Sequence, residues 1–230
     1  MGSLYALGLG PGDPDLMTVK ARRLLEQVPL IFAATRRAGA PSFALELALP
    51  FIDQARQGVV LLPFPAPGEG WGGHARCIAE RVREGDAAFL AEGDPLLYSS
   101  FIGVLSCLER LGVSVSVVPG VASPLAAAAA AGLALADDQQ RLAILPAMYA
   151  LDRLPETLRA FDTLVLLKVA PVFEAVMDCL EAAGCAERIV HVRRVGRPEQ
   201  SVLVGSEAIR AAPRDVTADY FSLLLVGPGT

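Results

Sequence analysis

The sequence predicts an α/β protein, and three observations carry this prediction. Short apolar runs typical of strands alternate with segments whose apolar residues recur at helical spacing. Two turns rich in glycine and proline, Gly8–Pro14 and Glu92–Ser99, each follow an apolar run and precede a helical pattern. Apolar residues make up 53% of the 230 residues, which is enough for a sizeable core. Strands alternating with helices form right-handed βαβ units and a largely parallel sheet.

The elements of the first half follow in order. A strand at Leu4–Leu9 precedes a helix for which Thr18 is the expected N-cap, with Asp15 as a competitor. Residues 36–73 show little regularity, and the prolines and glycines between 63 and 73 predict a loop. The other expected elements are strands over 30–34, 87–91 and 113–118, a helix over 74–83, and a helix striped by Phe101, Val104, Leu105 and Leu108.

The second half begins after a junction. We expect an N-terminal domain over 1–119, a junction over 120–124 and a C-terminal domain over 125–230, which opens with an alanine-rich helix. Strands are expected over 142–145, 164–167, 189–195, 201–204 and 220–226, and one helix carries Phe173, Val176, Met177 and Leu180 on one face before Gly184 ends it. Several strands with short connections indicate a mixed sheet in this half.

Composition and charge exclude several classes. A net charge of −5 argues against a nucleic-acid-binding surface. The long uncharged stretch 111–136 is interrupted by glycines and prolines, so we expect no membrane span and a soluble protein. We expect no signal peptide, because no basic region precedes the expected first strand, and the four cysteines lack C-x-x-C spacing. The two histidines also lack ligand spacing, so we expect no protein-bound metal. The scattered cysteines are typical of buried thiols in a reducing compartment, so we expect a cytoplasmic location.

The two turns predict a ligand site because the carboxyl ends of parallel strands share one edge of a sheet. Neither turn is a nucleotide fingerprint: the glycines at 8, 10 and 12 lack the last spacing of the dinucleotide motif, and Pro11 removes an N–H. The first turn by itself is more typical of a structural bend. The second turn carries Asp94 and Tyr98, which favour a functional role.

Six blocks of the sequence resemble the tetrapyrrole methylases, which transfer methyl groups from S-adenosylmethionine. The blocks are GLGPGDPDLMTVKA (8–21), LAEGDPLLYSSF (90–101), VPGVAS (118–123), RLAILPA (141–147), DTLVLLKV (162–169) and DYFSLLLV (219–226). The similarity runs nearly from end to end. The YSSF, LKV and YFS elements are most similar to the branch of this family that methylates carbon 20 of a reduced tetrapyrrole.

The resemblance implies two α/β domains with the cofactor in a cleft between them, a tetrapyrrole substrate and a homodimer. It also implies that S-adenosylmethionine, which leaves as S-adenosylhomocysteine, is held by Pro11, Glu92, Gly93, Asp94, Leu97, Ala122, Ser123, Lys168, Val195, Gly196, Ser222 and Leu223. An in-line methyl transfer depends chiefly on positioning, and backbone carbonyls of glycine-rich turns are suited to aim a polarised methyl group.

Three side chains are candidates for catalysis: Asp94, Lys168 and Tyr220. Asp94 is interpreted as a carboxylate that orients the ligands or relays a proton, with a turn aspartate as the alternative. Lys168 ends an apolar strand, where it either pairs with a carboxylate or lies exposed. Tyr220 presents its hydroxyl to the ring or lies at the edge of the core.

Other assignments stay open. The substrate's carboxylates require donors, for which Arg36 and Arg37 are candidates and Arg141 and Arg153 weaker ones, although each is more typical of a solvated surface. Trp71 is either a lid over the macrocycle or a loop anchor. Two other functions remain: a methylase of the same family that acts on another corrinoid carbon, and a tetrapyrrole-binding carrier without activity. More distant relatives modify ribosomal RNA or a protein histidine.

Overall fold

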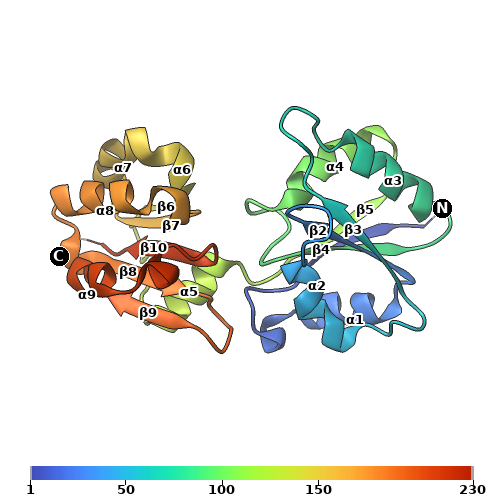
Figure 1. Ribbon diagram of the computed structural model, residues 1–230, viewed down its shortest axis with the longest axis horizontal. Coiled ribbons are helices and arrows are strands. Elements are labelled where there is room, and N and C mark those ends of the chain that lie inside the picture. The colour runs from blue at the N-terminus through green and yellow to red at the C-terminus, as the bar shows by residue number, and fades with distance from the viewer. Residues whose placement is uncertain (1, 229–230) are drawn as a thin grey trace. The chain divides into compact units, whose positions relative to one another are not determined.

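The computed structural model describes residues 2–228, and the chain divides into two compact units, Met1–Ala122 and Ser123–Thr230. Each unit is an open β-sheet with helices on both faces (Figure 1). The predicted α/β class with two α/β domains is confirmed.

The sheet of the first unit contains five parallel strands in the order β3-β2-β4-β1-β5. The strands are β1 (Leu4–Gly8), β2 (Leu30–Thr35), β3 (Gly58–Pro63), β4 (Ala87–Ala91) and β5 (Val115–Val118). In the register of the sheet, Leu4 of β1 pairs with Ala87 on one side and Val115 on the other. The strands that precede the two turns, β1 and β4, are therefore direct neighbours.

Four helices cover this sheet: α1 (Val19–Gln27), α2 (Phe43–Ala48), α3 (Gly72–Val82) and α4 (Ser100–Arg110). The helices α1 and α2 lie on one face, and α3 and α4 on the other (Figure 1). Successive strand residues point to opposite faces of the sheet, so Leu7 packs against α1 and α2 and Ala6 packs against α3 and α4. The connections after β1 and β4 thus leave toward opposite faces, which is the topology at which open α/β sheets bind ligands.

The second unit has a mixed sheet, as predicted, in the order β6-β7-β10-β8-β9. Its strands are β6 (Leu142–Pro146), β7 (Thr163–Leu167), β8 (Ile189–Arg193), β9 (Ser201–Val204) and β10 (Ser222–Val226). The pair β6 and β7 is parallel, whereas β10 runs antiparallel to both β7 and β8, and β8 antiparallel to β9.

The helices of the second unit are α5 (Ser123–Ala131), α6 (Ala147–Ala150), α7 (Leu154–Ala160), α8 (Phe173–Ala182), α9 (Ser206–Ala211) and α10 (Arg214–Thr217). The predicted apolar face of α8 packs onto the sheet through Val176, Met177 and Leu180. Gly184 ends this helix at φ 73°, and the N–H of Cys185 returns to the carbonyl of Leu180 at 2.9 Å, which is the geometry of a Schellman motif.

The structure corrects several expected bounds. Residues 36–73, interpreted as irregular, contain α2 and β3; β3 is an edge strand with mostly exposed or half-exposed side chains, so its apolar alternation is weak. The strands expected over 113–118 and 220–226 begin at Val115 and Ser222, and the one expected over 189–195 ends at Arg193. The short helices α6, α7, α9 and α10 were not predicted.

Candidate functional site

The two glycine- and proline-rich turns lie side by side at the carboxyl edge of the first sheet. Gly10 of the first turn and Gly93 of the second form an antiparallel bridge. The N–H of Gly93 donates to the carbonyl of Gly10 at 2.8 Å, and the N–H of Gly10 donates to the carbonyl of Gly93 at 3.3 Å. Both residues have positive φ, 81° and 62°, which favours glycine. The two turns therefore form one continuous edge.

Asp94 joins a third loop to this edge. Its Oδ1 accepts a hydrogen bond from the N–H of Leu96 at 2.8 Å, the local contact typical of an aspartate in a turn. Its Oδ2 accepts a hydrogen bond from the N–H of Gly120 at 3.1 Å, across 26 residues of sequence. Asp94 thus holds the loop after β4 against the loop after β5 through Oδ2, while Oδ1 fixes its own turn.

Three glycines at the ends of adjacent strands make this close approach possible; we call Gly8, Gly93 and Gly120 the glycine junction. A Cβ added at Gly120 would lie 2.1 Å from the carbonyl oxygen of Gly93, and one added at Gly8 would lie 2.4 Å from the nitrogen of Gly120. Both neighbours are backbone atoms, which cannot move aside as a flexible side chain would. The glycine junction therefore excludes any side chain at these two positions.

The remaining predicted residues of the first unit lie around the glycine junction. Pro11 and Leu97 are half-buried, and Glu92 is exposed directly after β4. The N–H of Leu97 donates to the carbonyl of Asp94 at 3.3 Å, and Ala122 follows Gly120 by two residues. The predicted cofactor residues of this unit thus share one edge of its sheet, and two of them, Glu92 and Asp94, carry carboxylates.

In the second unit, the predicted residues share one edge as well. Because β10 lies between β7 and β8, with Leu223 opposite Leu167 and Ser222 opposite Arg193, the end of β7, the end of β8 and the start of β10 coincide. The predicted residues at this edge are Lys168, Val195, Gly196, Tyr220, Ser222 and Leu223. Ser123 begins α5 and Tyr220 is exposed, with its ring edge-on to Phe221 at a centroid distance of 5.1 Å.

Two cationic residues at this edge have the left-handed backbone conformation. Lys168 directly follows β7 at φ 55°, and Arg194 directly follows β8 at φ 47°. This conformation costs a non-glycine residue about 1–3 kcal/mol, and such residues concentrate at functional sites. The strain and the common edge single out Lys168 and Arg194 together.

Asp219 was missed by the sequence analysis, yet it organises this edge. Its Oδ2 accepts hydrogen bonds from Nε of Arg193 at 2.9 Å and from Nε of Arg194 at 2.7 Å, and its Oδ1 accepts one from the N–H of Phe221 at 2.8 Å. Burial acts to raise the pKa of Asp219, but the Phe221 N–H and the two guanidinium groups outweigh it and hold the pKa below its ordinary value. Asp219 is therefore ionised.

His191 is the only histidine of the second unit and it is fully buried on β8. Its ring lies edge-on to Phe173 at a centroid distance of 6.1 Å, and neither ring nitrogen has a hydrogen-bond partner of ordinary geometry among residues 2–228. Burial, aided by the charge of Arg193, lowers its pKa to about 4 against the opposing effects of Asp219 and the Thr217 backbone. His191 is a neutral core residue near the edge.

The arginines proposed for substrate carboxylates divide into two groups. Arg141 precedes β6 and pairs with Asp162 at 3.5 Å. It therefore lies at the other edge of the second sheet from Lys168, roughly 20 Å away along the strands. Arg153 lies in a helical turn between α6 and α7. Arg36 and Arg37 follow β2 and do lie at the carboxyl edge of the first sheet. Arg141 and Lys168 therefore lie at opposite edges of the second sheet.

Trp71 is a loop anchor. Its ring lies against Gly103 of α4, where an added Cβ would lie 2.3 Å from the Trp71 Cδ1 atom. Phe64 and His74 meet the same ring edge-on at centroid distances of 5.8 and 5.4 Å. These contacts fix the loop before α3 to the outer helices.

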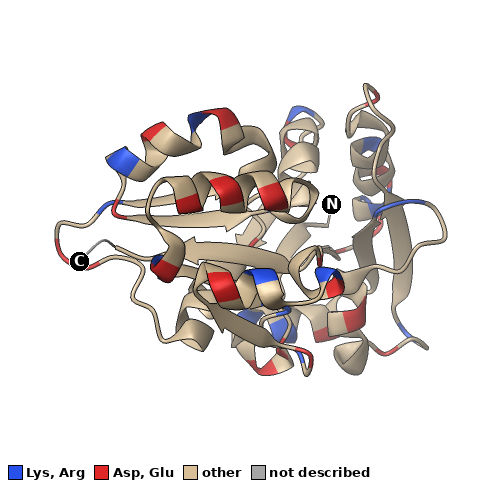
Figure 2. Ribbon diagram, turned by 60° about the vertical axis from the view of Figure 1, so that its left-hand side comes forward, with Lys and Arg blue, Asp and Glu red and all other residues tan. Residues whose placement is uncertain are grey.

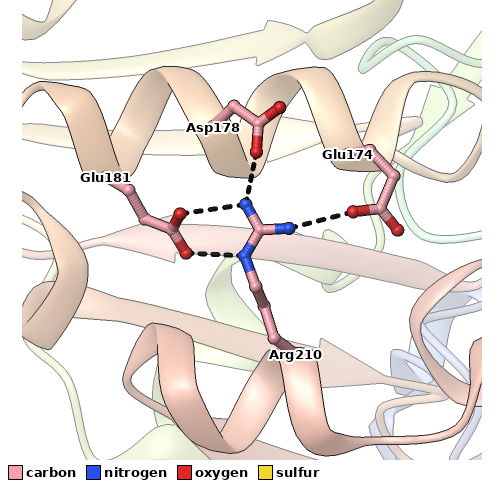
Figure 3. Close-up of polar contacts among 4 residues, drawn as sticks. All are labelled: Glu174, Asp178, Glu181 and Arg210. Carbon is pink, nitrogen blue, oxygen red and sulfur yellow. Dashed lines mark hydrogen bonds and ion pairs between the residues drawn. The ribbon is translucent and has the colours of Figure 1, made fainter.

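Charge is mixed over the molecule, with acidic and basic residues interspersed on its helices (Figure 2). The densest cluster joins α9 to α8, where Arg210 binds Glu174, Asp178 and Glu181 at 3.0, 2.5 and 2.7 Å (Figure 3). The hydrogen bonds to Glu181 and Asp178 raise the pKa of Arg210. This cluster lies on the outer helices and serves to hold them together.

Within residues 2–228, no group of three or more histidine, cysteine, aspartate or glutamate side chains is arranged to hold a metal ion. No helix there has both the length and the apolarity that a bilayer crossing requires.

The sequence matches the profile of the Tetrapyrrole (Corrin/Porphyrin) Methylases over residues 3–209. It is 31% identical to a cobalt-precorrin-2 C(20)-methyltransferase of Salmonella typhimurium, covering 98% of this chain and 96% of the relative. It is 29% identical to a precorrin-2 C(20)-methyltransferase of Sinorhizobium sp., covering 100% of this chain and 96% of the relative. The structure of a cobalt precorrin-4 methyltransferase superimposes with a TM-score of 0.74 and 25% identity, covering 98% of this chain and 94% of the other.

Proposed function

The chain belongs to the tetrapyrrole methylases, and within this family we propose that it transfers a methyl group from S-adenosylmethionine to carbon 20 of precorrin-2 or its cobalt-containing counterpart, a step of cobalamin biosynthesis. The observation that carries the proposal is the continuous edge formed by the two turns, which bridge through Gly10 and Gly93 at the switch point of the first sheet.

The residues at this edge fit a cationic cofactor. Glu92, Asp94 and Asp13 place carboxylates at the carboxyl edge of the first sheet, and the glycine junction keeps side chains away from the backbone there. S-adenosylmethionine would supply an electrophilic methyl group on a positively charged sulfur. Acidic groups and backbone carbonyls stabilise such a charge without reacting with it.

The chain's own contribution is mainly positioning. Asp94 fixes the loops after β4 and β5 through two backbone N–H groups, so the acceptor groups around it are preorganised. The lone pairs that these two bonds leave on the Asp94 carboxylate can accept from a hydroxyl or ammonium group of a ligand. Lys168 and Tyr220 present a cation and a hydroxyl at the edge of the second sheet, where we propose that they bind the acceptor ring or pass on the proton that carbon 20 releases.

The family resemblance also supports a homodimer in the cytoplasm. Sedimentation equilibrium of the purified protein tests the first part, with a mass of twice 24.2 kDa as the expected result.

The decisive experiment incubates the purified protein with precorrin-2 or cobalt-factor II and methyl-labelled S-adenosylmethionine, and locates the label by mass spectrometry and NMR. A label at carbon 20 is the expected result, and the preferred acceptor identifies the metal state of the substrate. A label at another carbon reassigns the chain within the family. Tetrapyrrole binding without methyl transfer identifies a carrier.

A further inference from the structure

The edge of the second sheet carries more positive charge than its own carboxylate balances. Arg193 and Arg194 both donate Nε–H to the same oxygen of Asp219. Their side chains are 17% and 34% exposed and that of Asp219 is 6% exposed, so the carboxylate is buried and the two guanidinium groups are partly buried. Two guanidinium groups facing one carboxylate leave a net positive charge where burial makes such charge costly. A second anion at this place would offset it.

Arg194 is held in a fixed position. Its backbone is strained at φ 47°, and its N–H donates to the carbonyl of Phe221 at 2.8 Å while its Nε donates to Asp219. Its two terminal nitrogens make no hydrogen bond with any residue between 2 and 228. Strain persists only where the surrounding contacts over-determine the conformation. The contacts of Arg194 therefore fix its guanidinium group with the two terminal nitrogens available to donate hydrogen bonds to a ligand.

Lys168 provides a second cation at the same edge. It follows β7 and Arg194 follows β8, with only β10 between these strands, so the two residues lie roughly 10 Å apart across the sheet. The Lys168 side chain makes no hydrogen bond or ion pair within residues 2–228. The edge thus combines a net positive charge with free donors at two neighbouring points.

We propose that Arg194 binds a carboxylate of a ligand and that Asp219 is the positioning residue that holds its guanidinium group for this purpose. A planar guanidinium matches a carboxylate through two parallel N–H···O bonds, a geometry that lysine cannot supply. The proposal rests on the proposed function for the source of the carboxylate. The source is either the amino-acid end of the cofactor or the acidic side chains of the tetrapyrrole.

The test compares Arg194→Gln with wild-type protein by calorimetry, using S-adenosylhomocysteine and methylthioadenosine, which lacks the amino-acid end. If the cofactor supplies the carboxylate, the substitution weakens S-adenosylhomocysteine binding about tenfold or more and leaves methylthioadenosine binding unchanged. If the tetrapyrrole supplies it, cofactor binding is unchanged and the KM for cobalt-factor II rises about tenfold with kcat nearly constant.

Three further variants complete the test. Arg194→Lys keeps the positive charge but loses the planar guanidinium, so binding of the same ligand is weakened by a smaller factor. If Arg194→Gln fails to fold, the lysine variant takes its place in the test. Asp219→Asn raises whichever constant Arg194→Gln raises, either the dissociation constant of S-adenosylhomocysteine or the KM for cobalt-factor II. Arg159→Gln, an exposed arginine on α7 near the opposite edge of the sheet, leaves both constants unchanged.

If folded Arg194 variants keep both the wild-type affinity for S-adenosylhomocysteine and the wild-type KM for cobalt-factor II, the inference is overturned while the proposed function stands. Wild-type protein that neither binds S-adenosylhomocysteine nor transfers a methyl group contradicts the proposed function instead.

Discussion

The carboxylate of Asp94 accepts the N–H of Gly120 at 3.1 Å and so joins the ends of two strands that are not neighbours in the sheet. The loops after β4 and β5 pass over β1, whose own turn bridges to Gly93. Three consecutive strands of the sheet therefore share one hydrogen-bonded edge. Single substitutions can remove these contacts individually and so test what each contributes to stability and to methyl transfer.

Asp94→Asn tests the role of the carboxylate. The amide oxygen still accepts one of the two N–H groups, so we expect a loss of about 1 kcal/mol in the free energy of unfolding. We expect methyl transfer to fall more than tenfold, because the substitution removes the negative charge that we propose to act on the ligand. Asp94→Ala leaves both N–H groups without their acceptor and costs about 2–3 kcal/mol. Normal turnover by Asp94→Asn would remove Asp94 from the proposed site.

Gly120→Ala tests the glycine junction. The added Cβ meets the Gly93 carbonyl oxygen at 2.1 Å, so the loops must separate and both stability and activity fall sharply. Gly73→Ala is the matched control: its Cβ meets no atom within 4 Å and lies in the first turn of α3, where alanine is neutral or stabilising by up to about 1 kcal/mol. Thermal unfolding and the methyl-transfer assay measure both effects, and similar behaviour of the two variants would count against the glycine junction.

Lys168→Gly separates stability from function. Glycine relieves the left-handed strain at φ 55°, so we expect the unfolding free energy to rise by about 1 kcal/mol while methyl transfer falls. Lys168→Ala retains the strain and loses the amine, so its activity falls without the gain in stability. Urea unfolding and initial rates distinguish the two variants. A fully active Lys168→Gly protein would show that the amine takes no part.

Tyr220→Phe removes one exposed hydroxyl and keeps the ring against Phe221. Substitutions of exposed side chains usually change the free energy of unfolding by less than about 0.5 kcal/mol. We expect the turnover to fall with little change in the melting temperature. A normal rate would restrict Tyr220 to a structural role.

His191 makes stability depend on pH. Its folded pKa of about 4 lies below the ordinary 6.5, so the unfolded chain binds more protons between these values. Stability is complete above pH 6.5 and decreases as the pH falls toward 4, by roughly 3 kcal/mol in all. His191→Leu abolishes this part of the dependence. Urea unfolding at several pH values measures it, and equal slopes for wild type and variant would contradict the prediction.

Arg210→Ala leaves three carboxylates on α8 without their shared cation (Figure 3). We expect a modest decrease in the melting temperature that shrinks as salt screens the remaining repulsion, with methyl transfer unchanged because the cluster lies on the outer helices. Arg210→Lys keeps the charge but not the fork and recovers part of the loss. A melting temperature that is insensitive to all of these changes would show the cluster to be energetically neutral.

Local patterns explain which elements the sequence revealed. The strand at Leu30–Thr35 and the helix at Phe173–Ala182 bury a continuous face, so their apolar periodicity is strong, and Thr18 does cap α1 by accepting the N–H of Ala21 at 3.2 Å. The edge strand β3 buries little and exists through its pairing with β2, which no local pattern displays. The start of β10 is delayed because Asp219 turns the chain through the N–H of Phe221.

The sequence by itself determined the fold class, the position of both turns after their strands and the family, because these depend on residues close together in the chain. Only the tertiary structure decided the partners of Asp94 and the pairing of Asp219 with Arg193 and Arg194, since each contact joins residues about 25 positions apart. A carboxylate in a turn looks the same in sequence whether it bonds its own loop or another one. The folded sheet fixes that choice, because it brings the ends of particular strands within hydrogen-bond distance.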